Sequence, residues 1–133
     1  MNDDKPKKFM VILGGGESGV GSAILARTKG FDVFLSDKGK LTDEHRQTLI
    51  DYTIDFEEGK HTEEKIFLAD EIVKSPGIPN TAPLIQKIRA KGIPVISEIE
   101  FAGRYTDAKM ICVTGSNGKT TTAGLIYHIL QSA

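Results

Sequence analysis

The sequence predicts an α/β protein built on a Rossmann-like parallel sheet with helices on both faces. Short apolar runs of strand length alternate with stretches of helical periodicity from residue 9 to residue 104. Loops rich in glycine or proline follow several of these runs, as expected at the carboxyl ends of parallel strands. A further apolar run near residue 110 leads into another glycine loop, which predicts the first strand, loop and helix of a second, truncated domain.

Each expected strand is a mostly apolar run bounded by turn-forming residues. Five such runs precede the second domain, at residues 9–13, 31–36, 54–56, 71–74 and 93–96. Residues 9–13 (FMVIL) contain no polar side chain. Such a composition is typical of a central parallel strand that is buried on both faces.

Each expected helix carries a start or stop signal. These signals are Gly30 after the first helix, Thr42 or Asp43 before the second, Thr62 before the third, and Pro83 and Gly92 around the fourth. Ser97 and Glu100 form a capping-box pattern before the fifth helix, in which Glu100 is expected to bond back to the Ser97 backbone.

Residues 105–133 are expected to form a linker and the start of the second domain. Met110–Val113 is an apolar run of strand length, and the helix after the next loop would place four apolar residues on one face, namely Leu125, Ile126, Ile129 and Leu130. The stretch 104–108 is the best candidate for the linker. We therefore divide the chain into a first domain at residues 1–104 and a linker with a second-domain segment at 105–133.

The composition favours a soluble protein of the cytoplasm. Of 133 residues, 39% are hydrophobic and 26% are charged, with a net charge of −1, which gives no electrostatic reason to bind nucleic acid or a membrane surface. No segment approaches the ~18 apolar residues that span a membrane. The N-terminus carries charges but no secretory apolar region. The single cysteine, Cys112, suits a reducing compartment.

The first glycine loop, Gly14-x-Gly16-x-x-Gly19, matches the dinucleotide-binding fingerprint in its context. It follows a strand and opens a helix, and Asp37 follows the second strand. Backbone N–H groups and the helix N-terminus would hold a diphosphate, while Asp37 would bond a ribose or a base. The pattern does not distinguish NAD, FAD and a UDP-linked ligand. Alternatively, the glycines serve only close packing of strand against helix.

The second glycine loop is typical of nucleoside triphosphate binding. It comprises Gly115, Ser116, Asn117, Gly118, Lys119, Thr120 and Thr121. Its N–H groups would bind ATP phosphates, with Lys119 on the β- and γ-phosphates and the Thr120 hydroxyl on Mg²⁺. The loop is shorter than the common pattern, because Val113 stands where that pattern has its first glycine. An ordinary strand–helix turn is the alternative.

Ser75-Pro76-Gly77 also falls at a predicted strand end, so it should line one crevice with Gly14–Gly19 and Asp37.

The other polar residues do not predict a functional site. Cys112 lies in an apolar strand without an apparent base. The histidines at 45, 61 and 128 lack metal-ligand spacing, and the pairs Glu57-Glu58 and Glu63-Glu64 are interpreted as solvated.

The chain has two different phosphate loops about a hundred residues apart, with SPGIP between them. This pattern closely resembles that of the Mur ligases of peptidoglycan synthesis. The motifs that carry the resemblance cover nearly the whole chain: VILGGGESG (11–19), LSDKG (35–39), SPGIP (75–79), GIPVISEIEFAGRY (92–105) and TGSNGKTTT (114–122). Within the family, the chain is most similar to the branch that adds D-glutamate. The short second loop is the form that this family uses.

The resemblance implies a function and a set of site residues. The UDP part of the substrate would contact Gly16, Glu17, Ser18, Gly19, Asp37, Lys38, Ser75, Pro76 and Gly77. Lys119, Thr120 and Mg²⁺ would position ATP to phosphorylate the carboxylate of UDP-N-acetylmuramoyl-L-alanine, and the amine of D-glutamate would then form the amide. The full-length enzyme is expected to be a monomer. Residues 1–133 alone are expected to bind UDP substrate without completing ligation.

Overall fold

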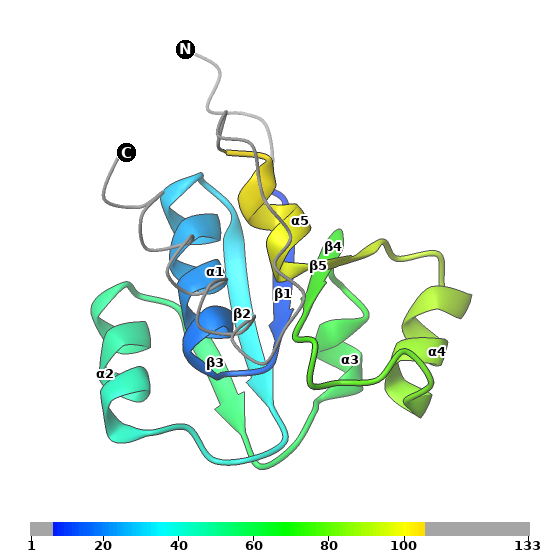
Figure 1. Ribbon diagram of the computed structural model, residues 1–133, viewed down its shortest axis with the longest axis horizontal. Helices are drawn as coiled ribbons and strands as arrows, with labels where there is room; N and C mark the ends of the chain where they lie inside the picture. The colour runs from blue at the N-terminus through cyan, green and yellow to red at the C-terminus, as the bar shows by residue number, and fades with distance from the viewer. Residues whose placement is uncertain (1–6, 106–133) are drawn as a thin grey trace, which may run out of the picture.

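The computed structural model describes residues 7–105, which form one five-stranded parallel sheet (Figure 1). Its strands are β1 (Phe9–Leu13), β2 (Asp32–Asp37), β3 (Asp55–Glu58), β4 (Glu71–Lys74) and β5 (Val95–Ser97). The strand order is β3-β2-β1-β4-β5, and every neighbouring pair is parallel. This arrangement confirms the predicted Rossmann-like class.

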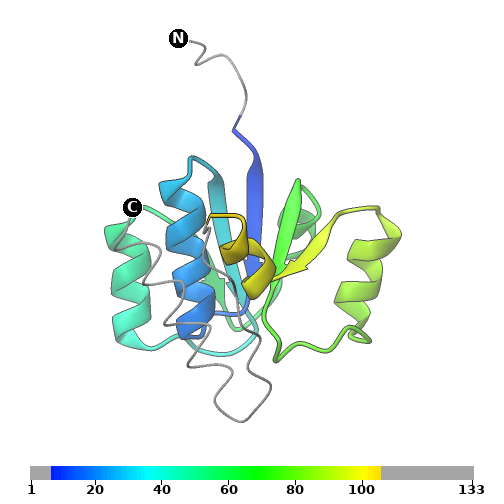
Figure 2. The same cartoon turned by 45° about the horizontal axis from the view of Figure 1, so that its top comes forward.

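Five helices connect and follow the strands within the described residues. They are α1 (Glu17–Thr28), α2 (Asp43–Asp51), α3 (Glu63–Ile66), α4 (Pro83–Ala90) and α5 (Glu98–Gly103). Helices α1, α2 and α5 cover one face of the sheet, and α3 and α4 cover the other (Figures 1 and 2). None of these helices is long and apolar enough to cross a membrane.

Strand β1 divides its side chains between two hydrophobic cores. Met10 and Ile12 pack with α1, while Val11 and Leu13 pack with α3 and α4, and all four are fully buried. Successive side chains of a strand point to opposite faces, so a central strand covered on both sides must be apolar throughout. The prediction for residues 9–13 is therefore confirmed, together with its reason.

Several boundaries differ from the predicted ones. Strand β3 continues to Glu58 and β5 to Ser97, because the pairing extends over polar residues that the apolar pattern did not include. Strand β5 begins only at Val95, two residues later than predicted. Thr42 and Ser97 cap α2 and α5 as predicted. The reciprocal bond from Glu100 to the Ser97 backbone is not among the hydrogen bonds of the described residues. The predicted elements of residues 109–133 lie outside the described part of the chain.

The strand order fixes where a ligand-binding crevice can form. The chain runs outward from β1 to β2 and β3, then returns to add β4 and β5 on the other side of β1. The loops after β1 and β4 therefore leave the sheet on opposite faces, which opens a crevice at their carboxyl ends. The three predicted binding segments all follow β1, β2 or β4.

Phe101 on α5 provides a test of the core. Its side chain is fully buried, and its ring makes edge contacts with Phe31 and Tyr105 at centroid distances of 6.1 Å and 5.4 Å. We expect Phe101→Ala to reduce the free energy of unfolding by about 3–5 kcal/mol in urea titrations. Ile99→Ala, on the exposed side of the same helix, should change it by less than about 0.5 kcal/mol. Equal effects of the two substitutions would contradict this packing.

Candidate functional site

The three predicted binding segments meet at the carboxyl edge of the sheet. The Gly14 N–H donates to the Ser36 carbonyl at the end of β2 (2.9 Å), and the Ser75 N–H donates to the Leu13 carbonyl of β1 (2.9 Å). A Cβ atom added to Gly14 would lie 2.6 Å from the Cβ of Ser75. The loops after β1, β2 and β4 are therefore in direct contact, as the expected single crevice requires.

Close packing explains two glycines of the loop but not the third. Gly14 has a φ of +109°, which L side chains rarely adopt. A Cβ on Gly19 would lie 1.9 Å from the Gly14 carbonyl oxygen. Gly16, by contrast, has an ordinary φ of −74° and open space where a side chain would stand. A glycine that packing does not require leaves room for a ligand to approach the backbone.

The first turn of α1 faces this open space with its backbone. Gly16 is the N-cap residue, and no side chain caps the helix. Within the described residues, the first intrahelical bond at this end runs from the Val20 N–H to the Gly16 carbonyl (2.9 Å). The preceding N–H groups and the positive end of the helix dipole suit an anion such as a diphosphate. Glu17 is exposed, Ser18 is half-buried, and buried Gly19 offers only its backbone.

Asp37 joins the loop after β1 to the loop after β2. One carboxylate oxygen accepts from the Gly15 N–H (2.6 Å), and the other accepts from the Gly39 N–H (2.7 Å). Each oxygen keeps a second lone pair for a ligand donor. Asp37 is therefore a loop-positioning residue as well as the predicted ligand contact. Lys38 lies beside it and is exposed.

Lys74 supports the proline-containing loop after β4. Its ammonium group donates to the Ile78 carbonyl (2.6 Å) and to the Ser75 carbonyl (3.2 Å). The Ser75 hydroxyl in turn accepts from the Gly77 N–H (3.3 Å). These bonds fix a loop whose exposed members, Pro76 and Gly77, are predicted ligand contacts. The sequence pattern did not single out Lys74.

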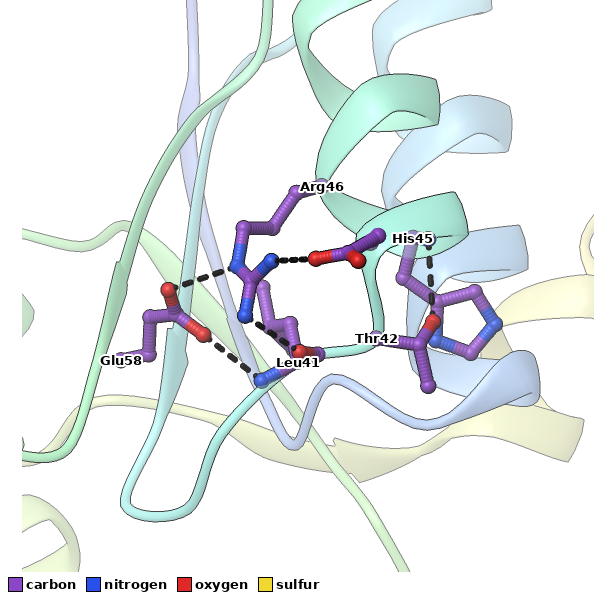
Figure 3. A network of polar contacts seen from close by, with 6 residues as sticks. Leu41, Thr42, His45, Arg46 and Glu58 are labelled. Carbon is purple, nitrogen blue, oxygen red and sulfur yellow. Dashed lines mark hydrogen bonds and ion pairs between the residues drawn. The ribbon is translucent and has the colours of Figure 1, made fainter.

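An ion pair holds the segment after Asp37, as Figure 3 shows. Arg46 of α2 donates from Nε to Glu58 of β3 (2.8 Å) and from a terminal nitrogen to the Leu41 carbonyl (2.8 Å), and it also pairs with Asp43. Glu58 also accepts from the Leu41 N–H (2.7 Å). Both backbone groups of Leu41 are thus bonded, and its buried side chain packs against Gly15. We name Arg46, Glu58 and Leu41 the loop clamp.

The expectation that Glu57 and Glu58 are solvated is wrong. Glu58 belongs to the loop clamp, and Glu57 accepts from both the backbone and the hydroxyl of Thr62 (2.5 Å each). Glu57 also bonds Ser36, which is fully buried and lies 2.7 Å from His61 Nδ1. A serine inside the apolar run of β2 was the one available signal, because buried polar groups need partners.

The capping-box pattern of Ser97 and Glu100 did not indicate the position of Glu98, the first residue of α5. It is only 2% exposed, and Oε1 lies 3.9 Å from where a Cβ on Gly19 would stand. The first turn of α5 therefore approaches the glycine loop from the side of β5. Glu98 thus lies beside the glycine loop in the first turn of α1.

The predicted ATP and Mg²⁺ residues cannot be placed in this site. Gly115, Ser116, Asn117, Gly118, Lys119, Thr120 and Thr121 all lie outside the described residues, as does Cys112. Within residues 7–105, no group of three or more His, Cys, Asp or Glu side chains is arranged to hold a metal ion. The described part of the site therefore consists of backbone N–H groups, the Asp37 carboxylate and the exposed Lys38 beside it.

The family model and the relatives that match this chain all belong to the Mur ligases. A family model described as Mur ligase MurD-like, N-terminal domain, matches residues 8–97. A relative from Bacteroides fragilis, named UDP-N-acetylmuramoylalanine--D-glutamate ligase, is 64% identical over 126 residues, which cover 95% of this chain and 28% of that protein. A relative of the same name from Porphyromonas gingivalis is 58% identical over 130 residues, covering 98% and 29%.

Among solved structures, a pseudomurein peptide ligase type C from Methanothermus fervidus superposes with a TM-score of 0.66 at 28% identity, covering 77% of this chain and 21% of that one. The chain thus spans less than a third of the length of each of these proteins.

The glycine loop gives a stability test that separates packing from ligand access. We expect Gly19→Ala to lower the free energy of unfolding by about 1–3 kcal/mol or more, because its Cβ would overlap the Gly14 carbonyl. Gly16→Ala should leave thermal and urea unfolding nearly unchanged, since its φ is ordinary and its surroundings are open. A large loss of stability in Gly16→Ala would contradict the geometry.

The side chains around Ser36 give a pH dependence. Burial lowers the pKa of His61 below 6.5, against the charges of Glu57 and Asp37. Burial also acts to raise the pKa of Glu57, but hydrogen bonds from Thr62 and Ser36 prevail and lower it below 4.5. At both groups the unfolded chain binds a proton more readily than the folded one, so stability present at neutral pH falls as the pH is lowered.

We therefore expect wild-type protein to lose more thermal stability between about pH 7.5 and 5.5 than His61→Asn, which cannot titrate there. His45→Asn, outside this network on α2, is the matched control and should lose as much as the wild type. Thermal unfolding of all three proteins in the same buffers provides the measurement. An identical loss in His61→Asn and the wild type would refute the assignment.

Proposed function

The chain belongs to the Mur ligases, as a MurD-like N-terminal domain, and from this premise we propose that it binds the UDP part of a cell-wall precursor. The parent enzyme in this proposal is an ATP-dependent ligase that joins D-glutamate to UDP-N-acetylmuramoyl-L-alanine. The curated relatives named for that reaction support it. Since the chain spans 28% of the first of them, the activity and substrates of the whole protein stay part of the proposal.

The contact of three loops around the N-terminus of α1 is the observation that supports UDP binding best. The diphosphate oxygens would accept hydrogen bonds from the backbone N–H groups of Gly16, Glu17, Ser18 and Gly19. Asp37 and Lys38 would face the uridine, and Ser75, Pro76 and Gly77 would close the opposite side. Bonds within the protein already fix these loops, so less conformational entropy is lost when a ligand binds.

The ATP part of the proposal rests on residues 105–133 as the linker and start of a second domain. Lys119 would act on the β- and γ-phosphates, the remaining residues of Gly115–Thr121 would contact ATP, and Thr120 would bind Mg²⁺. Phosphoryl transfer depends mainly on positioning and charge neutralisation, which a loop of N–H donors and one lysine can supply. We expect residues 1–133 alone to bind UDP substrate but not to release ADP in a ligation assay.

The partners in this proposal are small molecules: UDP-N-acetylmuramoyl-L-alanine, D-glutamate and ATP. The near-neutral charge supports the absence of a nucleic-acid or membrane partner. A cytoplasmic location belongs to the same proposal and is supported by the single cysteine. A monomeric full-length enzyme completes it.

Calorimetry with UDP, UDP-N-acetylmuramoyl-L-alanine and NAD tests the proposal. We expect both UDP ligands to bind, and Asp37→Asn to weaken them by about tenfold, because the amide replaces one of two charged acceptors for the Gly15 and Gly39 N–H groups. Gly16→Ala should weaken binding while keeping its stability. Asp32→Asn, at the opposite end of β2, is the matched control and should bind as the wild type does.

Tight NAD binding without UDP binding would instead favour a nicotinamide-dependent Rossmann domain and would refute the proposal. Binding of both UDP ligands with unchanged affinity in Asp37→Asn and Gly16→Ala would place the ligand elsewhere on the molecule.

A further inference from the structure

Lys74 is a half-buried lysine at the end of β4 whose charge is not neutralised within residues 7–105. Its Nζ donates to the Ile78 carbonyl (2.6 Å) and to the Ser75 carbonyl (3.2 Å). None of the ion pairs among these residues includes it. A charged group that is withdrawn from water is normally paired with an opposite charge. Lys74 therefore places an uncompensated positive charge beside the loop after β4.

The two carbonyl groups that Lys74 bonds are the two ends of one turn. The Ile78 N–H donates to the Ser75 carbonyl (3.1 Å), which closes a β-turn. Pro76 and Gly77 stand at the centre of this turn, and the Gly77 N–H donates to the Ser75 hydroxyl (3.3 Å). Because proline has no N–H group, few backbone bonds are available to fix the turn. The ammonium group spans it from Ser75 to Ile78 and supplies two of them.

Ser75 connects this turn to the glycine loop. Its N–H donates to the Leu13 carbonyl (2.9 Å), and its Cβ would lie 2.6 Å from a Cβ added to Gly14. Lys74 is paired with Leu13 in the register of β1 with β4, and Leu13 packs with α3 and α4. Paired residues of neighbouring strands point to the same face of a sheet. The Lys74 side chain thus begins on the face opposite α1, and its ammonium acts on the crevice through the turn.

We propose that Lys74 is a positioning residue for an anionic ligand, because its ammonium group holds the Ser75–Ile78 turn against the glycine loop and adds positive charge to that side of the crevice. The proposal rests on the proposed function, since it requires a diphosphate at the N-terminus of α1. The ammonium also offsets the partial negative charge of the two carbonyl oxygens, which would otherwise disfavour an anion nearby. A turn that is fixed in advance loses less conformational entropy when the ligand binds.

Calorimetry with UDP compares the wild type with Lys74→Met and Lys74→Arg. Methionine removes the donors and the charge, whereas a guanidinium group keeps both. We expect Lys74→Met to weaken UDP binding about tenfold at low ionic strength, and Lys74→Arg to stay within about threefold of the wild type. Because salt screens charge–charge attraction, the affinity of Lys74→Met should also fall less steeply with NaCl concentration. A loss of loop shape alone would leave the wild-type salt dependence unchanged.

Lys87→Met is the matched control. It removes a lysine of α4 whose ammonium is already paired with Glu63 (3.2 Å), so it should keep the wild-type affinity and salt dependence. Thermal unfolding verifies that each variant is folded. If Lys74→Met does not fold, Lys74→Gln takes its place, since it removes the charge but keeps an amide donor, and it should show the same reduced salt dependence.

Wild-type affinity or wild-type salt dependence in the folded variant that lacks the Lys74 charge would overturn the role of Lys74, although UDP binding would still support the proposed function. Absence of UDP binding in the wild type would refute both.

Hydrogen exchange in the ligand-free protein tests the turn separately from UDP binding. We expect the Ile78 amide proton, which closes the turn, to exchange at least about tenfold faster in Lys74→Met than in the wild type. The amide proton of Ile12 in β1 should exchange at the same rate in both proteins. Unchanged exchange at Ile78 would overturn the positioning role, whether or not the protein binds UDP.

Discussion

The two hydrogen bonds that Asp37 accepts connect the parts of the crevice that would otherwise be independent loops. Its carboxylate receives one N–H from the loop after β1 and one from the loop after β2, at 2.6 Å and 2.7 Å. Hydrogen bonds to an ionised acceptor are about twice as strong as bonds between neutral groups. The glycine loop can therefore keep its left-handed turn at Gly14 while the segment after Asp37 stays beside it.

The remaining contacts depend on this junction. Leu41 packs against Gly15 only because the chain after Asp37 returns toward the glycine loop, and the loop clamp then holds both backbone groups of Leu41. On the other side, Ser75 packs against Gly14 with its N–H bonded to β1. Side chains that pack directly against a glycine backbone leave no room for an added Cβ atom, so the loops tolerate little change in volume where they meet.

The parts of the molecule that follow local patterns could be predicted from the sequence. The apolar run of β1, the glycine loop, Asp37 after β2 and the proline loop after β4 are each visible within a few residues, and the topology of a parallel sheet brings them together. The partners of Glu57, Glu58 and His61 could not be predicted in this way. They depend on the register that sets Ser36 beside Glu57, and a polar DFEE strand gives no apolar pattern from which to infer that register.

Strand β3 shows how the two faces of an edge strand can serve one site. Glu57 and Glu58 are consecutive, so they point to opposite faces of the sheet. Glu58 holds the segment after Asp37 through Leu41 and Arg46, and Glu57 holds the His61 loop through Ser36 and Thr62. Close glycine packing thus builds the loop after β1, whereas charged hydrogen bonds hold the loops after β2 and β3. In the proposed function, substitutions in β3 should therefore act on uridine binding before they act on diphosphate binding, even though neither glutamate belongs to the predicted contact set.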